Sequence, residues 1–150
     1  MAKITFTEVY NLRGPEIKLT RGIVGIYFVF VPGLAIPYPF GTSTLVYVGM
    51  SESQQNSIGK RLRSHLTGQS GNEGIKNYAE HHTVKFTYHS LAGLGFVGTD
   101  DLFDIERFFL TDFLNYRGSY PICNGQGGVE RDDSPTKMQE IDVDWRFFEQ

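Results

Sequence analysis

One acidic side chain in this 150-residue sequence falls among apolar neighbours of a predicted helix. The helix is expected at about residues 100–116. On a helical wheel of about 100° per residue, Glu106 lies between Phe113 and Leu110, inside the apolar stripe. A carboxylate that faces a hydrophobic core costs several kcal/mol unless it is paired, protonated or bound to a metal. Glu106 is therefore either part of a structural ion pair with an arginine, or a metal ligand or catalytic acid.

A second group of side chains is basic and lies on a predicted helix at about residues 58–67. Its N-terminal half carries Lys60, Arg61 and Arg63, although the helix macrodipole disfavours cations there. Arg61 and His65 are four residues apart, so they lie on one face of the helix. This pair is a candidate for binding phosphate at the edge of a cleft. A solvated basic surface is the alternative.

Two tyrosines occupy predicted strands close to glycines. If the strands alternate, Tyr27 shares a face with Gly25, and Tyr47 shares a face with Gly49. Glycines at these positions leave room for a backbone or a ligand. The two tyrosines therefore either line a site or belong to an aromatic core.

The elements that carry these residues describe one α+β domain with a small mixed or antiparallel sheet flanked by helices. Three strands are predicted from β-branched and aromatic runs or from alternation, at residues 23–31, 44–50 and 83–90. Three helices are predicted, at about residues 58–67, 73–81 and 100–116, with N-caps at Ser57 for the first and Thr99 for the third. Gly68 and Gly118 end these two helices. Residues 3–10 predict an edge strand, and the proline-rich residues 32–43 predict a long loop.

Composition narrows the class of protein. Hydrophobic residues make up 40% of the chain and aromatic residues 14%, which argues against disorder. Cys123 is the only cysteine, which excludes an internal disulfide framework and fits a reducing compartment. The chain has neither an apolar run of about 20 residues nor a signal-peptide core at its N-terminus. We therefore expect a cytoplasmic protein that does not contact a membrane.

The charge of the chain is unevenly distributed. The net charge is −3, with the excess of acids in residues 126–150 and a basic patch in residues 57–77. A local basic patch can bind phosphate groups even when the total charge is negative.

The candidate residues follow one another in a recognisable order. The order is Gly25-Ile26-Tyr27, Tyr47-Val48-Gly49, Ser51, Arg61, His65, Glu106 and Asn124. This series resembles the GIY-YIG nuclease domain, with Val48 in place of the usual second isoleucine. The resemblance covers about residues 22–125. It leaves residues 1–21 as an N-terminal strand and loop and residues 126–150 as an acidic C-terminal extension.

The resemblance implies a three-stranded antiparallel sheet flanked by helices, and hydrolysis of DNA phosphodiester bonds with one Mg²⁺ or Mn²⁺ ion per active site. It implies that Glu106 is the metal ligand and that Arg61 contacts the scissile phosphate. It further implies that Tyr27 or Tyr47 activates or positions the water, that His65 assists, and that Asn124 supports the site. The basic residues of the patch and a small polar residue after the second motif are expected to contact DNA: Lys60, Arg63, Lys76 and Ser51. Where members of this family often carry a lysine after the second motif, this chain has Glu52.

The small size of the chain favours a stand-alone, restriction- or phage-like endonuclease. Cutting both strands of a duplex calls for two sites, so we expect a homodimer. A non-catalytic nucleic-acid-binding module with the same fold is the alternative. A structural protein with Glu106 in a buried ion pair is the third hypothesis.

Overall fold

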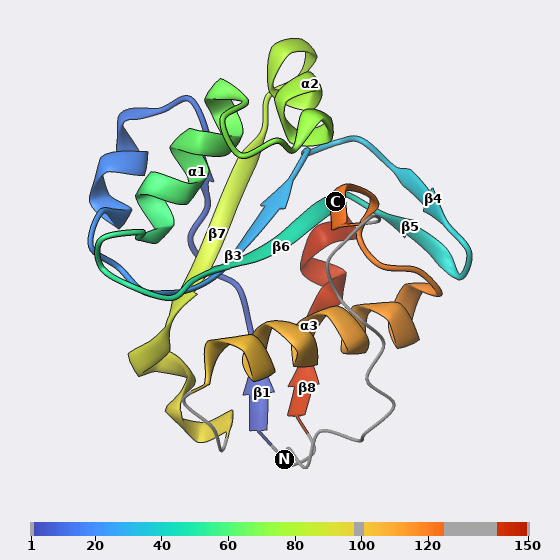
Figure 1. The fold of residues 1–150 in the computed structure, drawn as a ribbon. Helices are drawn as coiled ribbons and strands as arrows, with labels where there is room; N and C mark the ends of the chain where they lie inside the picture. Colours follow the sequence, from blue (N-terminus) through green and yellow to red (C-terminus); the bar gives the residue numbers. More distant parts are fainter. Residues whose placement is uncertain (1, 98–100, 125–140, 150) are drawn as a thin grey trace.

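The computed structural model describes residues 2–97, 101–124 and 141–149 of the chain (Figure 1). The strands are β1 (Ala2–Ile4), β2 (Tyr10–Asn11), β3 (Gly25–Phe30), β4 (Ile36–Tyr38), β5 (Gly41–Ser43), β6 (Leu45–Ser51), β7 (Lys85–Ser90) and β8 (Ile141–Val143). The α-helices are α1 (Ile58–Thr67), α2 (Glu73–His81) and α3 (Leu102–Arg117). Short 3-10 helices are η1 (Pro15–Thr20), η2 (Leu91–Val97), η3 (Ile122–Asn124) and η4 (Trp145–Glu149). The fold is α+β, as the sequence predicts.

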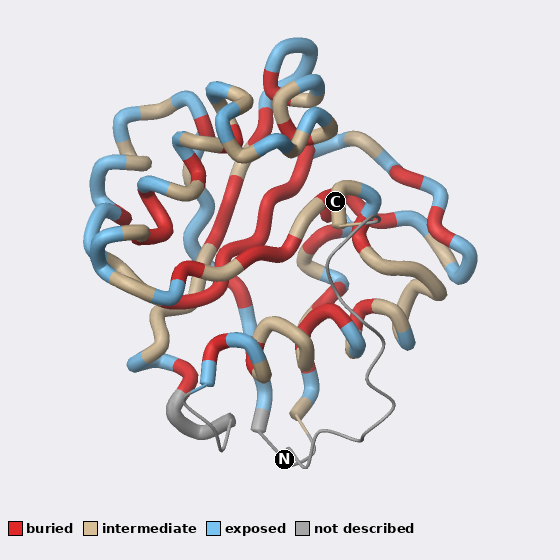
Figure 2. The backbone as a smooth tube through the Cα atoms, viewed as in Figure 1, coloured by how far each residue is buried: buried red, intermediate tan, exposed pale blue. Residues whose placement is uncertain are grey.

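The main sheet is antiparallel and has the strand order β2-β7-β3-β6. Its last three strands are the three that the apolar and alternating segments predict. All six residues of β3 are buried, as expected for a central strand covered on both faces (Figure 2). The two-residue strand β2 adds a fourth strand at the edge beside β7, at the end of the segment where the sequence predicts an N-terminal edge strand.

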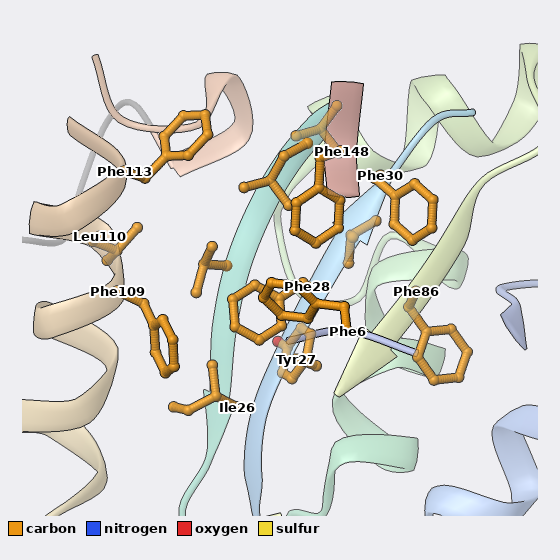
Figure 3. Close-up of a cluster of buried hydrophobic side chains, with 14 of the residues drawn as sticks. Phe6, Ile26, Tyr27, Phe28, Phe30, Phe86, Phe109, Leu110, Phe113 and Phe148 are labelled. Atoms are coloured by element: carbon orange, nitrogen blue, oxygen red, sulfur yellow. The ribbon is translucent and has the colours of Figure 1, made fainter. Parts of the chain in front are cut away.

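The two faces of the sheet are covered by different helices. Phe28 points to the face where α3 packs, and its ring meets Phe109 edge to face, with 5.1 Å between the centroids (Figure 3). Phe148 from η4 packs against the same side of Phe28. Because side chains alternate along a strand, Tyr27 points to the opposite face, where it meets His65 of α1.

The N-terminal segment differs from the single edge strand expected at residues 3–10. β1 pairs in parallel with β8 from the other end of the chain, with Ile4 opposite Val143. Phe6 lies in the core beside Phe28 and Phe148, with ring centroids 4.8 and 4.9 Å away. This segment therefore crosses from a small second sheet into the core, because the aromatic residues of the C-terminal segment lie there.

The proline-rich segment 32–43 is a short hairpin of β4 and β5 and not an open loop. Pro37 is tolerated there because this two-stranded pair does not need its missing N–H for a central ladder. Tyr38 is buried, and its hydroxyl donates to the Leu45 carbonyl and accepts from the Ile122 N–H. Phe40 stays 68% exposed at the turn.

The helices begin and end largely where the cap residues predict. The Ser57 side chain accepts the Lys60 N–H at the start of α1, and Gly68 ends this helix with a φ of 87°. α3 starts at Leu102 with Asp101 as its N-cap, in place of the expected Thr99, which lies outside the described residues. The Asp101 carboxylate accepts the Phe103 N–H and so satisfies a free donor of the first turn. In the part of the chain that the structure describes, no helix is long and apolar enough to span a membrane.

Candidate functional site

Three of the predicted site residues form an aromatic cluster between the sheet and α1. Tyr27 on β3 lies opposite Gly49 on β6, which places Tyr47 diagonally across from it on the same face. The ring centroids of Tyr27 and Tyr47 are 6.0 Å apart. His65 of α1 completes the cluster, 5.8 Å from Tyr27 and 4.9 Å from Tyr47.

Gly49 makes this cluster possible. A Cβ atom at this position would lie 2.5 Å from the Tyr27 hydroxyl and 2.6 Å from the Tyr47 ring. The space that the sequence suggests for a backbone or a ligand is therefore filled by the two tyrosine rings. At Gly25 the neighbour is backbone, because a Cβ atom there would overlap the His89 carbonyl.

His65 is 1% exposed, and both of its ring nitrogens have partners. Nε2 is hydrogen bonded to the Tyr27 hydroxyl and Nδ1 to the Ser70 hydroxyl, each at 2.8 Å. Burial, together with the neighbouring Arg61 guanidinium, lowers the pKa of His65 to about 4. The imidazole is therefore neutral near pH 7, with one nitrogen donating and the other accepting. Ser70 is a new member of the site, and no pattern in the sequence points to it.

The two tyrosines differ in their access to solvent. Tyr27 is fully buried, and burial, followed by the neighbouring Tyr47, raises its pKa well above the ordinary value. Tyr47 is only partly buried, and its pKa is raised first by burial and then by the Glu106 carboxylate, while Arg61 lowers it. Both phenols are protonated at neutral pH. Only Tyr47 reaches the surface, and Tyr27 lies behind it.

Arg61 lies beside both phenols. Burial lowers its pKa, but the Tyr27 and Tyr47 hydroxyls raise it by more, so the guanidinium stays charged. Its Nε atom is buried and has no hydrogen-bond partner among the described residues. The side chain as a whole is half-exposed, and a charged, planar guanidinium is suited to binding an anion such as a phosphate.

Glu106 approaches this cluster from α3, on the other face of the sheet. Because β6 is the last strand of the sheet, side chains from both faces can meet beside its free edge. The Glu106 carboxylate influences the pKa of Tyr47, and burial raises its own pKa to about 7, with Arg61 opposing the shift. Within the described ranges, this carboxylate has no hydrogen bond and no ion pair within 4.0 Å, so the structural ion pair is not supported.

A half-buried carboxylate with no hydrogen bond or ion pair among the described residues is a suitable ligand for a hard divalent cation. The described residues contain no group of three or more His, Cys, Asp and Glu side chains that could enclose a metal ion. This donor set fits Mg²⁺ or Mn²⁺, since Mg²⁺ keeps several waters and takes one or two carboxylates plus substrate phosphates. It does not fit a closed structural zinc site.

Asn124 closes the free edge of β6. Its side-chain Oδ1 accepts the Val48 N–H, and its Nδ2 donates to the Val48 carbonyl, both at 2.9 Å. The amide therefore replaces one residue of a missing neighbouring strand. Since Val48 lies between Tyr47 and Gly49, Asn124 holds the strand that carries the cluster, and it acts as a positioning residue.

The four residues expected to contact DNA have different surroundings. Lys60 and Arg63 are exposed on α1, but on a helical wheel Arg63 points about 200° away from Arg61. Lys76 is partly buried, with its methylene groups near Gly68. Ser51 is 0% exposed, and its hydroxyl donates to the Asn56 carbonyl at 2.5 Å. Ser51 therefore holds the loop before α1 and is not available for DNA in this structure.

Comparisons with protein-family models, with curated proteins and with solved structures give no match for this chain.

Proposed function

We propose that this protein is a divalent-metal-dependent DNA endonuclease of the GIY-YIG type, which hydrolyses phosphodiester bonds. The observation that carries this proposal is that Arg61 and Glu106 lie near enough to Tyr47, and to each other, to influence the ionisation there. The two residues come from helices on opposite faces of the sheet, and neither of the two has an ion-pair partner in the described part of the chain.

The reaction requires a group that neutralises the charge of the phosphate in the transition state. Arg61 provides a charged guanidinium on a half-exposed side chain, which can bind a phosphate oxygen. An ion held by Glu106 would supply further positive charge at the phosphate and at the leaving oxygen. The fold contributes by bringing these two helices to one strand edge.

The reaction also requires a correctly placed water. Tyr47 is the tyrosine at the surface, so its hydroxyl is the group that contacts and orients this water. Tyr27, His65 and Ser70 form a hydrogen-bonded chain behind Tyr47. When His65 carries its proton on Nδ1, that nitrogen donates a hydrogen bond to Ser70. Nε2 then accepts a hydrogen bond from the Tyr27 hydroxyl, and the Tyr27 oxygen can accept hydrogen bonds from its neighbours.

Glu52, which is exposed, stands where a lysine is common in this family, and it does not contribute a phosphate contact. The remaining expectations belong to the same proposal. They are a GIY-YIG-like core at about residues 22–125, DNA as the partner, a homodimer, a location in the cytoplasm and a stand-alone, restriction- or phage-like role.

The test is plasmid cleavage by the wild type, by Glu106→Gln and by Glu80→Gln. Glu80 is an exposed residue of α2 outside the site and serves as the matched control. We expect nicking or linearisation of supercoiled DNA with Mg²⁺ or Mn²⁺ by the wild type and the control. Glu106→Gln, or the wild type with EDTA, should leave the plasmid intact.

Two results would overturn the proposal. One is the absence of cleavage of supercoiled, linear and branched DNA by the folded wild type. If DNA is bound without being cut, the protein is a binding module and not an enzyme. The other is cleavage by Glu106→Gln at the wild-type rate, which would show that Glu106 is not the metal ligand.

A further inference from the structure

A pocket of about 650 Å³ lies between α2 and η3, outside the catalytic cluster. Four residues of one face of α2, spaced at i, i+3, i+4 and i+7, line one side: Gly74, Asn77, Tyr78 and His81. Ile122 and Cys123 of η3 line the other side. No residue of the proposed catalytic set lines this pocket.

The helix and η3 pack closely at one end of the pocket. A Cβ atom on Gly74 would lie 2.8 Å from the Cys123 sulfur, so the absence of a side chain at Gly74 permits this contact. Burial raises the pKa of the Cys123 thiol to about 12, and burial also raises the pKa of the Tyr78 phenol. Both groups are therefore uncharged at neutral pH.

The lining suits a flat, neutral ring and not an anion. Among the described residues neither a lysine nor an arginine lines the pocket, whereas the acidic Glu73 does, so the lining does not favour a phosphate group. The rings of Tyr78 and His82 lie with their centroids 6.0 Å apart and provide aromatic faces for stacking. The exposed Asn77 carries an amide that can both donate and accept hydrogen bonds. Ile122 leaves 51% of its surface uncovered beside these groups.

The pocket shares a wall with the candidate catalytic site. Asn72 lines it and donates its backbone N–H to the hydroxyl of Ser70, the residue that is bonded to His65. The Asn72 side chain also donates to the Cys123 carbonyl. Asn124, which follows Cys123 in the chain, is hydrogen bonded to Val48 of β6, next to Tyr47. Two short connections therefore join the pocket to the candidate site, one through Ser70 to His65 and one through Asn124 to β6.

We propose that the pocket binds one unpaired nucleobase of the strand that is cleaved. This inference rests on the proposed nuclease function and specifies its substrate. A base inside a duplex cannot enter a pocket of this kind, whereas a single-stranded, mismatched or extruded base can. The enzyme should therefore prefer DNA that has an unpaired base next to the cleaved phosphate.

The first test measures binding without metal and without cleavage. The four deoxynucleoside monophosphates are titrated into the ¹⁵N-labelled protein, with deoxyribose 5-phosphate as a probe that lacks a base. We expect amide shifts at Asn77, Tyr78 and His82 with the nucleotides, and none there with the sugar phosphate. Tyr78→Leu and Asn77→Ala should weaken nucleotide binding about tenfold, as expected for loss of a stacking contact. Glu80→Gln, on the same helix outside the pocket, should have no effect.

The second test uses Glu106→Gln and labelled oligonucleotides. Single-stranded DNA and duplex DNA with one unpaired base should bind about tenfold more tightly than a perfect duplex, and Tyr78→Leu should remove this difference. Equal affinity for all three DNAs, or nucleotide shifts confined to Arg61 and His65, would overturn the inference. Neither test involves cleavage. A protein that does not bind a base in the pocket can therefore be distinguished from one that does not cleave the plasmid.

Discussion

The Glu106 carboxylate should destabilise the folded protein at alkaline pH. Its pKa is about 7 in the fold, against 4.5 for the unperturbed group, because partial burial raises it and the nearby Arg61 offsets only part of that rise. The folded state therefore binds a proton more tightly than the unfolded state. The resulting stabilisation is complete below pH 4.5 and is lost as the pH rises through 7. At 1.36 kcal/mol per pKa unit, the stability of the wild type should fall by about 3 kcal/mol across this range.

Glu106→Gln should remove this pH dependence, since the amide has the same shape and no charge. We expect the variant to be more stable than the wild type at pH 8 and similar to it near pH 4.5. Between pH 5 and pH 8 the difference should grow by about 2–3 kcal/mol, from the same pKa shift. The measurement is urea unfolding in EDTA at several pH values, with Glu80→Gln as the exposed control.

Two outcomes would refute this reasoning. If Glu106→Gln were less stable than the wild type by about 3–5 kcal/mol, Glu106 would be one half of a buried ion pair. If the difference did not change with pH, the carboxylate would not be desolvated. Addition of Mg²⁺ at pH 8 should stabilise the wild type and leave the variant unchanged, because only the wild type has the ligand.

Three further changes test the packing of the site. Gly49→Ala should destabilise the protein by about 1–3 kcal/mol in urea unfolding, because the new methyl group overlaps the tyrosine rings; unchanged stability would contradict the close packing. Asn124→Ala should cost about 1–3 kcal/mol and speed amide exchange at Val48, whose N–H and carbonyl lose their partners. Ser70→Ala should shift the ¹⁵N signals of the His65 ring nitrogens and lower the cleavage rate. Ser70→Thr keeps the hydroxyl and should retain the wild-type ¹⁵N signals and cleavage rate. Identical spectra for Ser70→Ala and the wild type would exclude the hydrogen bond.

Local sequence patterns predict most of the elements that carry the site. The apolar run of β3, the cap residues of α1 and the alternation of β7 act over a few residues, so they can be read directly. The hairpin β4–β5 was missed, because its prolines and glycines also suit a loop. The division of the N-terminal segment into β1 and β2 is not visible in the sequence, because β1 pairs with β8 from the opposite end of the chain.

The candidate site also has features that the sequence predicts and features that it does not. The types and order of Tyr27, Tyr47, Arg61, His65 and Glu106 are visible in the sequence, as is the conflict between Glu106 and its apolar neighbours. Those features follow from residue chemistry and helical spacing, and they suffice to suggest phosphodiester chemistry. They do not say which tyrosine reaches solvent or which residue completes the His65 hydrogen bonds.

Contacts in the folded chain decide those questions. Tyr27 is buried because Gly49 of the neighbouring strand has no side chain and leaves room for its ring. Ser70 reaches His65 only because Gly68 turns the chain back at the end of α1. The sequence by itself determines the set of reactive groups and the helices and strands that carry them. Only the tertiary structure decides which groups are exposed, paired or left without a partner, because burial and hydrogen bonding depend on neighbours far away along the chain.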